Sequence, residues 1–371
     1  MKKTAIKKLL LAGGGHAHIG LLRRLPTNRQ TSTDITLISE QPYSIYSGML
    51  PGWMAGHYDL AEISIDIKAL CQKAKVRFVP ACVGQVIADA NKLVTTDKQS
   101  FDYDLLSLNT GADTAMQWLN GDVDHTDTVV PIRPLHHFVE RWQQILIDAQ
   151  QPEAYRLAVV GAGAAATELV MAAKFALQSI NSNHKISLVC GDELLADFDK
   201  NFKRRVIKQL DRHNIEIIYA RAKGYSEGRL LTTAQSLNAD AVIAATGVTG
   251  AAWTRDTDIK TVEDGFIAVN SAQQSVSHPN VFAVGDTSTR VDKVVAHSGV
   301  HAVFGGRVEA DNLLAYLNNA PLQDYQPKNR TLYLLSCGDK YAIGSWGRYS
   351  LQGRWVWELK RQIDKRFVEA S

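Results

Sequence analysis

A glycine turn between a strand and a helix occurs twice in this chain, with similar segments after each copy. The first copy, KKLLLAGGGHAH, is followed by DITLISE and later by FDYDLLSLNTGAD, which ends near Thr110 and Gly111. The second copy, YRLAVVGAGAAATELV, is followed by KISLVCGDE and by ADAVIAATGV, which contains Thr246 and Gly247. One short glycine pattern arises readily by chance, but two copies with matching strands indicate two βαβ units. The sequence therefore predicts an α/β chain with two Rossmann-like dinucleotide-binding domains.

Both turns suit the diphosphate of a dinucleotide. A helix start offers unpaired N–H groups and the positive end of its dipole, and glycine lets a diphosphate approach the backbone closely. The turn residues are Gly13, Gly14 and Gly15 in the first copy and Gly161, Gly163 and Ala166 in the second. Two dinucleotides on one chain indicate electron transfer between a nicotinamide and a flavin, chemistry that the cofactors perform while the protein orients them.

The first turn departs from the pattern G-x-G-x-x-G at its third glycine. His18 stands there, with His16 two residues before it. In the first helical turn both imidazoles would donate to phosphate oxygens or, when protonated, offset their charge. The alternative is that His18 packs between helix and sheet with its nitrogens satisfied inside the protein.

Composition and charge exclude several classes of protein. The 371 residues are 45% hydrophobic and 21% charged, which is typical of a soluble globular chain of two or three domains. A net charge of +3 without long runs of one sign does not indicate a nucleic-acid partner. No run reaches the roughly 18 apolar residues of a membrane span, so any membrane contact is expected to be peripheral. Glycines interrupt the apolar stretch of the basic N-terminus, which predicts a first strand and not a signal peptide, and we expect a cytoplasmic protein.

The four cysteines, Cys71, Cys82, Cys190 and Cys337, form no C-x-x-C or C-x-x-x-x-C pair. A flavin disulfide reductase passes electrons through two neighbouring thiols, so this reaction is not expected. For Cys337 two interpretations stay open, an inert strand residue and a nucleophile toward sulfur compounds.

The order of GGGHAH, NTG, GAGAAATE, AATG and VFAVGD resembles the FAD-dependent pyridine nucleotide-disulfide oxidoreductase superfamily. Within it, YSIYSGMLPGWMAGHY, HSGVHAVFGGRVEADNL and GRWVWELKRQIDKRF are most similar to the flavoprotein module fused to selenophosphate synthetase, a relative of type II NADH dehydrogenases. The resemblance implies FAD and NAD(P)H as cofactors. It also implies a discontinuous FAD domain (1–118 and 267–325), an inserted NAD(P)H domain (119–266) and a C-terminal segment of strands and a helix (326–371).

The resemblance assigns residues to the FAD site. The first glycine turn, with its two histidines, holds the diphosphate, and the acidic ribose ligand of the family falls at Ser39, with Glu40 one place later. Gly285 and Asp286, in VFAVGD, meet the ribityl and phosphate region, although a turn residue or helix cap is the alternative for Asp286. The remaining assignments are Thr110 and Gly111 at the cofactor, Ser47, Gly48 and Met49 along the isoalloxazine ring, and Ser298, Gly299 and Val300 at the helix start that stabilises negative charge on the reduced flavin. A surface loop packed on its own aromatics is the alternative for the segment around Gly48.

The second turn is assigned to the nicotinamide dinucleotide, together with Gly247. The segment CGDELLADFD after the next strand contains four acids, among them Asp192, and no Lys or Arg. An acid there accepts hydrogen bonds from a 2′-hydroxyl and repels a 2′-phosphate, so NADH is favoured over NADPH. The acidic position of the family falls on Cys190. Glu168 matches a family glutamate that faces the gap between nicotinamide and flavin; the alternative is an exposed or capping glutamate.

Three functions follow from these assignments. The first is hydride transfer from NADH to FAD and on to a quinone or similar acceptor. The second is oxidation of reduced sulfur or selenium compounds, and the third is a non-catalytic FAD-binding regulatory module. The tail carries Trp355, Leu359, Ile363 and Phe367 at i, i+4 steps among basic residues, which predicts an amphipathic helix at a membrane interface. The same stripe could instead seal a homodimer or dock on the core of the chain.

Overall fold

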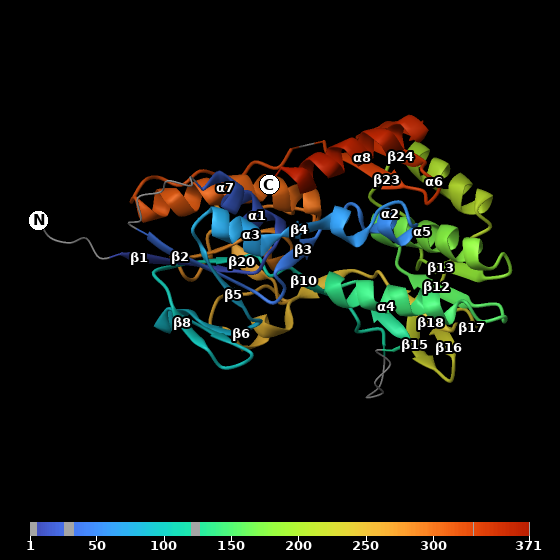
Figure 1. Cartoon of the computed structure of the whole chain (residues 1–371), viewed down its shortest axis with the longest axis horizontal. Coiled ribbons are helices and arrows are strands. Elements are labelled where there is room, and N and C mark those ends of the chain that lie inside the picture. Colours follow the sequence, from blue (N-terminus) through green and yellow to red (C-terminus); the bar gives the residue numbers. More distant parts are fainter. Residues whose placement is uncertain (1–5, 26–32, 120–126, 329, 371) are drawn as a thin grey trace, which may run out of the picture.

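The computed structural model describes residues 6–25, 33–119, 127–328 and 330–370, and its centre is two five-stranded parallel sheets (Figure 1). The first sheet has the order β21-β9-β1-β2-β5. Its strands are β1 (Lys7–Ala12), β2 (Thr33–Ser39), β5 (Arg77–Pro80), β9 (Leu105–Leu108) and β21 (Val281–Ala283). Leu9 pairs with Ile35 on one side and with Leu105 on the other. The central strands are continuous apolar runs because helices and loops cover both faces of the sheet.

The second sheet repeats this plan with the order β11-β18-β12-β13-β14. Its strands are β11 (Val129–Pro131), β12 (Arg156–Val160), β13 (Lys185–Val189), β14 (Glu216–Ile218) and β18 (Ala241–Ala244). Leu157 pairs with Ile186 and Ala241, as Leu9 pairs with its two neighbours in the first sheet. The predicted α/β fold with two Rossmann-like cores is confirmed.

In each unit, an antiparallel three-stranded meander connects the outermost strand of the parallel sheet to the next strand of that sheet along the sequence. The first meander is β6 (Val83–Ile87), β7 (Lys92–Thr95) and β8 (Ser100–Asp102). The second is β15 (Ala222–Ser226), β16 (Arg229–Thr232) and β17 (Ser236–Asn238). The two units are joined by the antiparallel pair β10 (Ala112–Thr114) and β19 (Val248–Gly250). The domain boundaries at 118, 266 and 325 stay a prediction.

The helices cover the sheets and position the sites. They are α1 (His16–Arg24), α2 (Leu50–Met54), α3 (Ile67–Lys73) and α7 (Gly299–Leu317) in the first unit, and α4 (Leu135–Asp148), α5 (Ala164–Ile180) and α6 (Lys200–Arg212) in the second. The remaining short strands are β3 (Tyr43–Ile45) with β4 (Ser64–Asp66), and β20 (Ile267–Val269) with β22 (Ser288–Arg290). Helices α1 and α7 pack so closely that a Cβ on Gly306 would lie 2.5 Å from the Cβ of Ala17.

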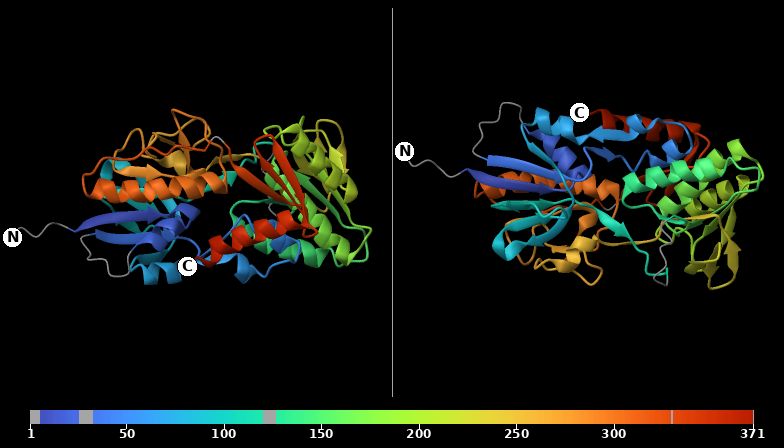
Figure 2. Two further views of the ribbon diagram at one scale, coloured as in Figure 1. Left: turned by 90° about the horizontal axis from the view of Figure 1, so that it is seen from above. Right: turned by 60° about the horizontal axis from the view of Figure 1, so that its bottom comes forward.

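The C-terminal segment lies across both units. An antiparallel sheet of β23 (Leu332–Ser336), β24 (Ala342–Trp346) and β25 (Tyr349–Gly353) packs on α5 and α6, and α8 (Arg354–Glu369) then runs toward the first unit (Figures 1 and 2). The predicted amphipathic helix is present, but its apolar stripe divides. Trp355, Leu359 and Ile363 are exposed, whereas Phe367 packs against His16 and Tyr46.

Candidate functional site

The first glycine turn is a backbone cradle with no room for side chains. Gly13 has a φ of +97°, and a Cβ there would lie 2.3 Å from the carbonyl oxygen of Asn109. A Cβ on Gly15 would lie 2.1 Å from Asn109 Oδ1, and one on Gly14 would lie 2.3 Å from Ile67 Cδ1. The structure shows no hydrogen-bond partner among the described residues for the N–H groups of Gly14 and Gly15. Free N–H groups at a helix start suit an anion, so the turn fits a diphosphate.

Asn109 joins the separate parts of this cradle. Its Oδ1 accepts from the N–H of Ala17 at 3.1 Å, and its Nδ2 donates to the carbonyl of Val284 at 2.8 Å. One side chain therefore connects the start of α1, the end of β9 and the residue before Gly285. Asn109 stands beside Thr110 in the NTG motif but was not among the residues predicted for the site.

Asp286 lies next to this cradle, on the loop after β21. Its Oδ2 accepts from Arg133 Nη2 at 2.8 Å, while its Oδ1 is buried and has no hydrogen-bond partner among the described residues. Thr287 Oγ1 accepts from the N–H of Gly111 at 2.9 Å, which brings the Thr110–Gly111 turn to the same place. A buried carboxylate oxygen needs a donor, and a hydroxyl of the FAD ribityl chain would supply one. The predicted Asp286 position therefore fits FAD, and Arg133 was not anticipated.

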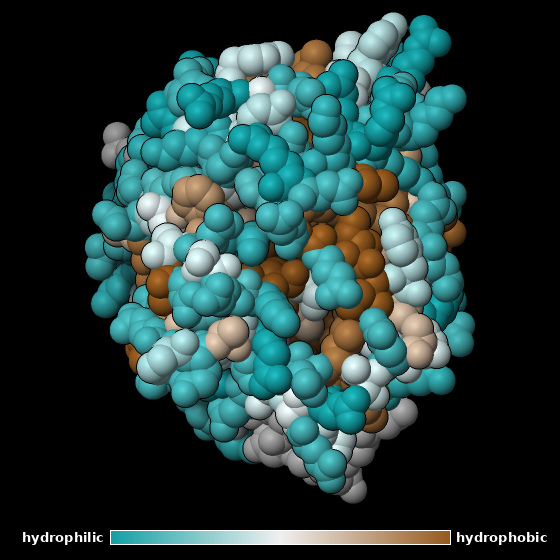
Figure 3. All heavy atoms as spheres, turned by 90° about the vertical axis from the view of Figure 1, so that its right-hand side faces the viewer, coloured by the Kyte–Doolittle hydropathy of each residue, from teal (hydrophilic) through white to brown (hydrophobic). Residues whose placement is uncertain are grey.

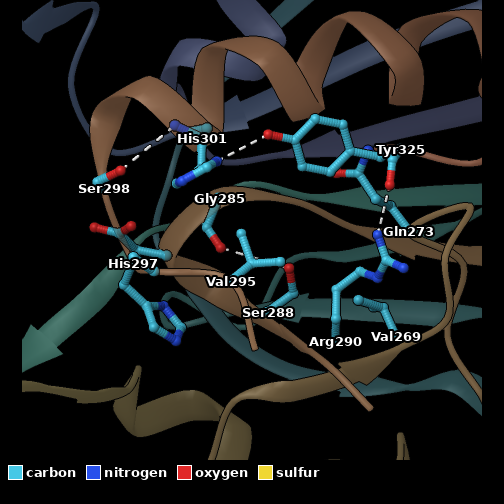
Figure 4. A pocket seen from close by; sticks show the side chains of 13 residues that line it. Val269, Gln273, Gly285, Ser288, Arg290, Val295, His297, Ser298, His301 and Tyr325 are labelled. Carbon is cyan, nitrogen blue, oxygen red and sulfur yellow. Dashed lines mark hydrogen bonds between the residues drawn. The ribbon is translucent and has the colours of Figure 1, made fainter. Parts of the chain in front are cut away.

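The start of α7 and the loop around Gly48 meet beside Asp286. Ser298 caps α7 by accepting from the N–H of His301 at 3.5 Å, and Figure 4 shows both residues above Gly285. A Cβ on Gly299 would lie 3.9 Å from Ser47 Oγ, so the two predicted flavin-facing segments are neighbours. Met49 is buried, which leaves Ser47 as the exposed side chain of its loop.

Both histidines of the first turn lie inside the protein. His18 is fully buried, and its Nδ1 and Nε2 lie 2.6 Å from Gly13 O and from Ser107 Oγ. His16 stacks on the ring of Phe367 at 5.5 Å. Burial lowers the pKa of each to about 4, so neither is protonated at neutral pH. The prediction of a direct, charge-offsetting contact between His18 and phosphate is corrected in favour of its alternative, because the protein itself uses both ring nitrogens.

The predicted ribose ligands stand at the end of β2. Glu40 is exposed, and its Oε2 lies 3.3 Å from His136 Nε2 of the second unit. Ser39 Oγ would lie 2.8 Å from a Cβ on Gly14, so it lies at the cradle. Glu40, His136 and His137 bring ligand atoms within 4.8 Å of one another. Glu40 therefore links the first unit to the second.

The second glycine turn has the same geometry as the first. Gly161 has a φ of +152°, and a Cβ there would lie 2.2 Å from the carbonyl of Ala245. A Cβ on Gly163 would meet no described atom within 4 Å, so this turn opens to space that a second diphosphate fits. Ala166 is fully buried and packs under Gly161, as the third position of the pattern requires.

The acidic segment after β13 is not free of basic groups in space. Cys190 is buried, whereas Asp192 is exposed and forms a salt bridge with Arg221. The pKa of Asp192 is lowered by this hydrogen bond and charge. The sequence placed no Lys or Arg in the segment, but the fold brings Arg221 to it from the loop before β15.

Glu168 lies in a buried polar cluster under α8. Its Oε1 accepts from the N–H of Ser336 at 2.7 Å, and burial raises its pKa to about 7, against the lowering effect of Lys360. Lys360 Nζ donates to Asp364 Oδ2 at 2.7 Å and to the carbonyl of Gly48 at 2.5 Å. Asp364 Oδ1 accepts from the hydroxyl of Tyr46 at 3.2 Å. Lys360 and Asp364 were not predicted as site residues; their i, i+4 spacing opposite the exposed stripe is the signal in the sequence.

The cysteines are all unpaired. Cys337 is buried, and burial raises its pKa well above the ordinary value. A buried thiol with a raised pKa is a poor nucleophile, so the structure favours an inert residue at this position, directly after the end of β23.

Comparison with known proteins identifies relatives over nearly the whole chain. A family model described as "Pyridine nucleotide-disulphide oxidoreductase" matches residues 7–302. A protein named Type II NADH:quinone oxidoreductase from Staphylococcus saprophyticus is 23% identical over 389 aligned residues, which cover 98% of this chain and 95% of the relative. A protein of the same name from Staphylococcus aureus is 22% identical over 386 residues, with coverage of 98% and 95%.

Solved structures share the fold. A sulfide:quinone oxidoreductase from Aquifex aeolicus superposes with a TM-score of 0.81 at 18% identity and covers 98% of this chain and 92% of its own. NDH2 from Plasmodium falciparum, solved in complex with NADH, has a TM-score of 0.81 at 14% identity, with coverage of 98% and 96%. At identities of 18% and 14%, the likeness shows the fold alone.

Proposed function

We propose that this chain, which belongs to the pyridine nucleotide-disulphide oxidoreductase family, takes hydride from NADH at a bound FAD and passes the electrons to a quinone. The observation that carries this proposal is the pair of glycine turns on two equivalent sheets, without a pair of thiols beside them. The name shared by its relatives from two Staphylococcus species supports the same reaction.

In the first unit, FAD would be held by groups that have no hydrogen-bond partner among the described residues. The N–H groups of Gly14 and Gly15 bind the diphosphate, and Asp286 Oδ1 accepts from the ribityl chain. The N-terminus of α7, at Ser298, Gly299 and Val300, stabilises negative charge with its dipole. When bound, FAD would supply the capacity to take up a hydride and to release electrons, while the residues above orient it.

The second unit would hold NADH, and Glu168 would supply a proton when the quinone is reduced. Gly161, Gly163 and Ala166 admit the nicotinamide dinucleotide. Reduction of a quinone to a quinol consumes protons, and an acid works best when its pKa is near the operating pH. The pKa of about 7 at Glu168, set mainly by burial, suits this exchange, and Lys360 keeps the carboxylate form available.

We further propose that the exposed face of α8 contacts a membrane, where lipophilic quinones reside. The structure contains no described helix that is long and apolar enough to cross a bilayer. Trp355, Leu359 and Ile363 are 56%, 37% and 43% exposed on α8, and Trp346 and Tyr349 are 50% and 53% exposed on the adjoining sheet. Tryptophan and aliphatic side chains near basic residues favour the membrane interface. We place this contact on the inner face of the cell membrane.

The reaction is tested by anaerobic mixing of the FAD-loaded protein with NADH, NADPH, sulfide or selenide. NADH is expected to bleach the flavin absorbance, and a quinone is expected to restore it. Bleaching by sulfide or selenide and not by NADH would favour the second candidate, which the fold likeness to a sulfide:quinone oxidoreductase supports and the burial of Cys337 opposes. A yellow protein that no donor bleaches would be a regulatory module.

Membrane contact is tested by changing Trp355, Leu359 and Ile363 together to serine. The variant is expected to keep FAD and turnover with a water-soluble quinone, but to lose sedimentation with liposomes. Figure 3 shows that other apolar side chains reach the surface at the end of the molecule formed by the second unit. Ile147 of α4, in the second unit, is 56% exposed, so Ile147→Ser is the matched control. Loss of a homodimer on gel filtration, with liposome binding unchanged, would assign the face to a second copy.

A further inference from the structure

The histidine at the third glycine position belongs to a buried hydrogen-bonded chain. His18 Nδ1 lies 2.6 Å from Gly13 O, and His18 Nε2 lies 2.6 Å from Ser107 Oγ. Ser107 Oγ lies 2.7 Å from Glu309 Oε1. His18 comes from α1, Ser107 from β9 and Glu309 from α7, and each is at most 1% exposed. The chain ends on the glycine turn and does not reach solvent.

The donors and acceptors of this chain have one consistent order when its groups are neutral. A carbonyl oxygen only accepts, so His18 Nδ1 carries the hydrogen and Nε2 has a lone pair. The hydroxyl of Ser107 has a single hydrogen, and giving it to His18 leaves Ser107 Oγ to accept from a protonated Glu309. Burial raises the pKa of Glu309 to about 8 and lowers the pKa of His18 to about 4, so both effects favour these neutral forms.

The end of this hydrogen-bonded series at Gly13 fixes the orientation of one peptide group in the glycine turn. The carbonyl of Gly13 and the N–H of Gly14 belong to one planar trans peptide and point in opposite directions. While His18 holds the carbonyl toward the interior, the N–H of Gly14 faces away from it. That N–H has no partner among the described residues. The chain therefore determines where a donor for the diphosphate points.

We propose that Glu309, acting through Ser107 and His18, is a positioning residue for the FAD diphosphate, and that its protonated form supports cofactor binding. The inference rests on the FAD binding proposed above. It also explains why a histidine replaces glycine here: His18 fills the space between helix and strand and turns the Gly13–Gly14 peptide toward the ligand.

When Glu309 loses its proton, the donor and acceptor roles along the Glu309–Ser107–His18 series reverse. An ionised Glu309 accepts a hydrogen bond from the Ser107 hydroxyl, which then offers only a lone pair to His18 Nε2. The neutral imidazole therefore carries its hydrogen on Nε2, and the lone pair of Nδ1 faces Gly13 O at 2.6 Å. Two lone pairs at that distance repel each other, and the peptide turns away. Around Glu309, α1 contributes His18, β9 contributes Ser107, and Arg24 of α1 pairs with Asp311 of α7 on the exposed side. Burial raises the pKa of Glu309, and among the described residues the hydrogen bond from the Ser107 hydroxyl is the one interaction that lowers it.

His16, next to the chain, does not share it. Its pKa is lowered by burial and by Arg23 and raised by Asp286, but neither charge acts on Glu309. Any change of FAD binding above about pH 8 is therefore expected from Glu309 and not from His16.

The test is the dissociation constant of FAD for the apoprotein, followed by flavin fluorescence between about pH 6 and pH 9.5. If only the protonated form binds well, the constant is flat below about pH 8 and rises about tenfold per pH unit above it. Glu309→Gln carries an amide that donates to Ser107, so it is expected to bind as the wild type does at pH 6 and to stay flat to pH 9.5. Glu309→Leu has no donor, and we expect at least about tenfold weaker binding at every pH.

Ser107→Ala provides a second interruption of the chain, with circular dichroism of each apoprotein as the check of folding. It is expected to bind weakly and without the rise above pH 8, and Glu216→Gln at an exposed site of β14 is the matched control. A flat wild-type profile, or Glu309→Gln as weak as Glu309→Leu at pH 6, would overturn the inference while leaving NADH bleaching intact. Wild-type protein that binds no FAD at any pH would instead overturn the proposed function.

Discussion

Replacing Lys360 by methionine tests whether a buried charge holds α8 on the cofactor loop. Lys360 is 9% exposed, pairs with Asp364 at 2.7 Å and donates to the carbonyl of Gly48 at 2.5 Å. Methionine keeps much of the side-chain volume but leaves the carboxylate of Asp364 and the carbonyl of Gly48 without this donor. Removing one member of a buried ion pair costs about 3–5 kcal/mol, so we expect a loss of this size in the free energy of unfolding at about pH 8.

The loss in the free energy of unfolding depends on pH. The burial of Asp364 and Glu168 determines whether it grows or shrinks as the pH rises. Burial raises the pKa of Asp364 and of Glu168, and Lys360 lowers both. Without Lys360 both pKa values rise further. An acid whose pKa is raised on folding destabilises the folded state once the pH exceeds its unfolded pKa, and the penalty grows until the pH passes its folded pKa. The deficit of Lys360→Met is therefore largest above about pH 7 and shrinks as the pH falls below it.

Urea denaturation of the FAD-loaded protein between about pH 5.5 and pH 8.5 measures this deficit. Lys365→Met is the control, because Lys365 lies on the same helix and pairs with Glu62 at a partly exposed site, where the expected loss is at most about 1 kcal/mol. Adding Asp364→Leu to Lys360→Met should recover much of the loss by removing the unpaired carboxylate. A deficit as small as that of the control at pH 8, or one that does not vary with pH, would refute the buried-charge account.

Three further predictions follow from the site. Cys337→Ser is expected to keep NADH:quinone turnover within about threefold of wild type, because a buried thiol takes no part in the transfer; loss of the quinone step with NADH bleaching intact would contradict this. Asp192→Ala frees the guanidinium of Arg221 for a 2′-phosphate, so kcat/KM with NADPH should rise, and adding Arg221→Ala should abolish the gain; an unchanged coenzyme ratio would place selection elsewhere. Asn109→Leu removes the link between α1 and Val284, and titration should show FAD binding weaker by about tenfold or more, with Asn109→Asp intermediate because it retains the acceptor.

The parts of the fold that depend on local pattern could be predicted from the sequence. The two glycine turns, their strands and the amphipathic tail helix follow from spacing and periodicity alone. Glycine was also the right signal at Gly13 and Gly161, because a positive φ and a crowded Cβ position exclude other residues there.

The parts of the site that depend on distant residues could not be predicted in this way. Arg133 reaches Asp286 across 153 positions, and Arg221 reaches Asp192 across 29, so neither pair has a sequence spacing that identifies it. His18 was assigned to the phosphate because its partners lie 89 residues away at Ser107 and, beyond it, at Glu309. Tertiary contacts of this kind decide what a polar side chain in a recognised motif does.

The strand orders of the two sheets also have a consequence for the order in which the chain matures during synthesis. The second sheet takes all its strands from one continuous stretch, residues 129–244, whereas β21, at the edge of the first sheet, begins at Val281. Asp286 and α7 follow β21, so a nascent chain has no complete cofactor cradle until α7 has left the ribosome. Domains fold as units during translation, and here the unit that begins first is the one that is completed last. A nascent chain whose first 250 residues have left the ribosome would carry a finished second sheet beside a first sheet that still lacks its edge strand.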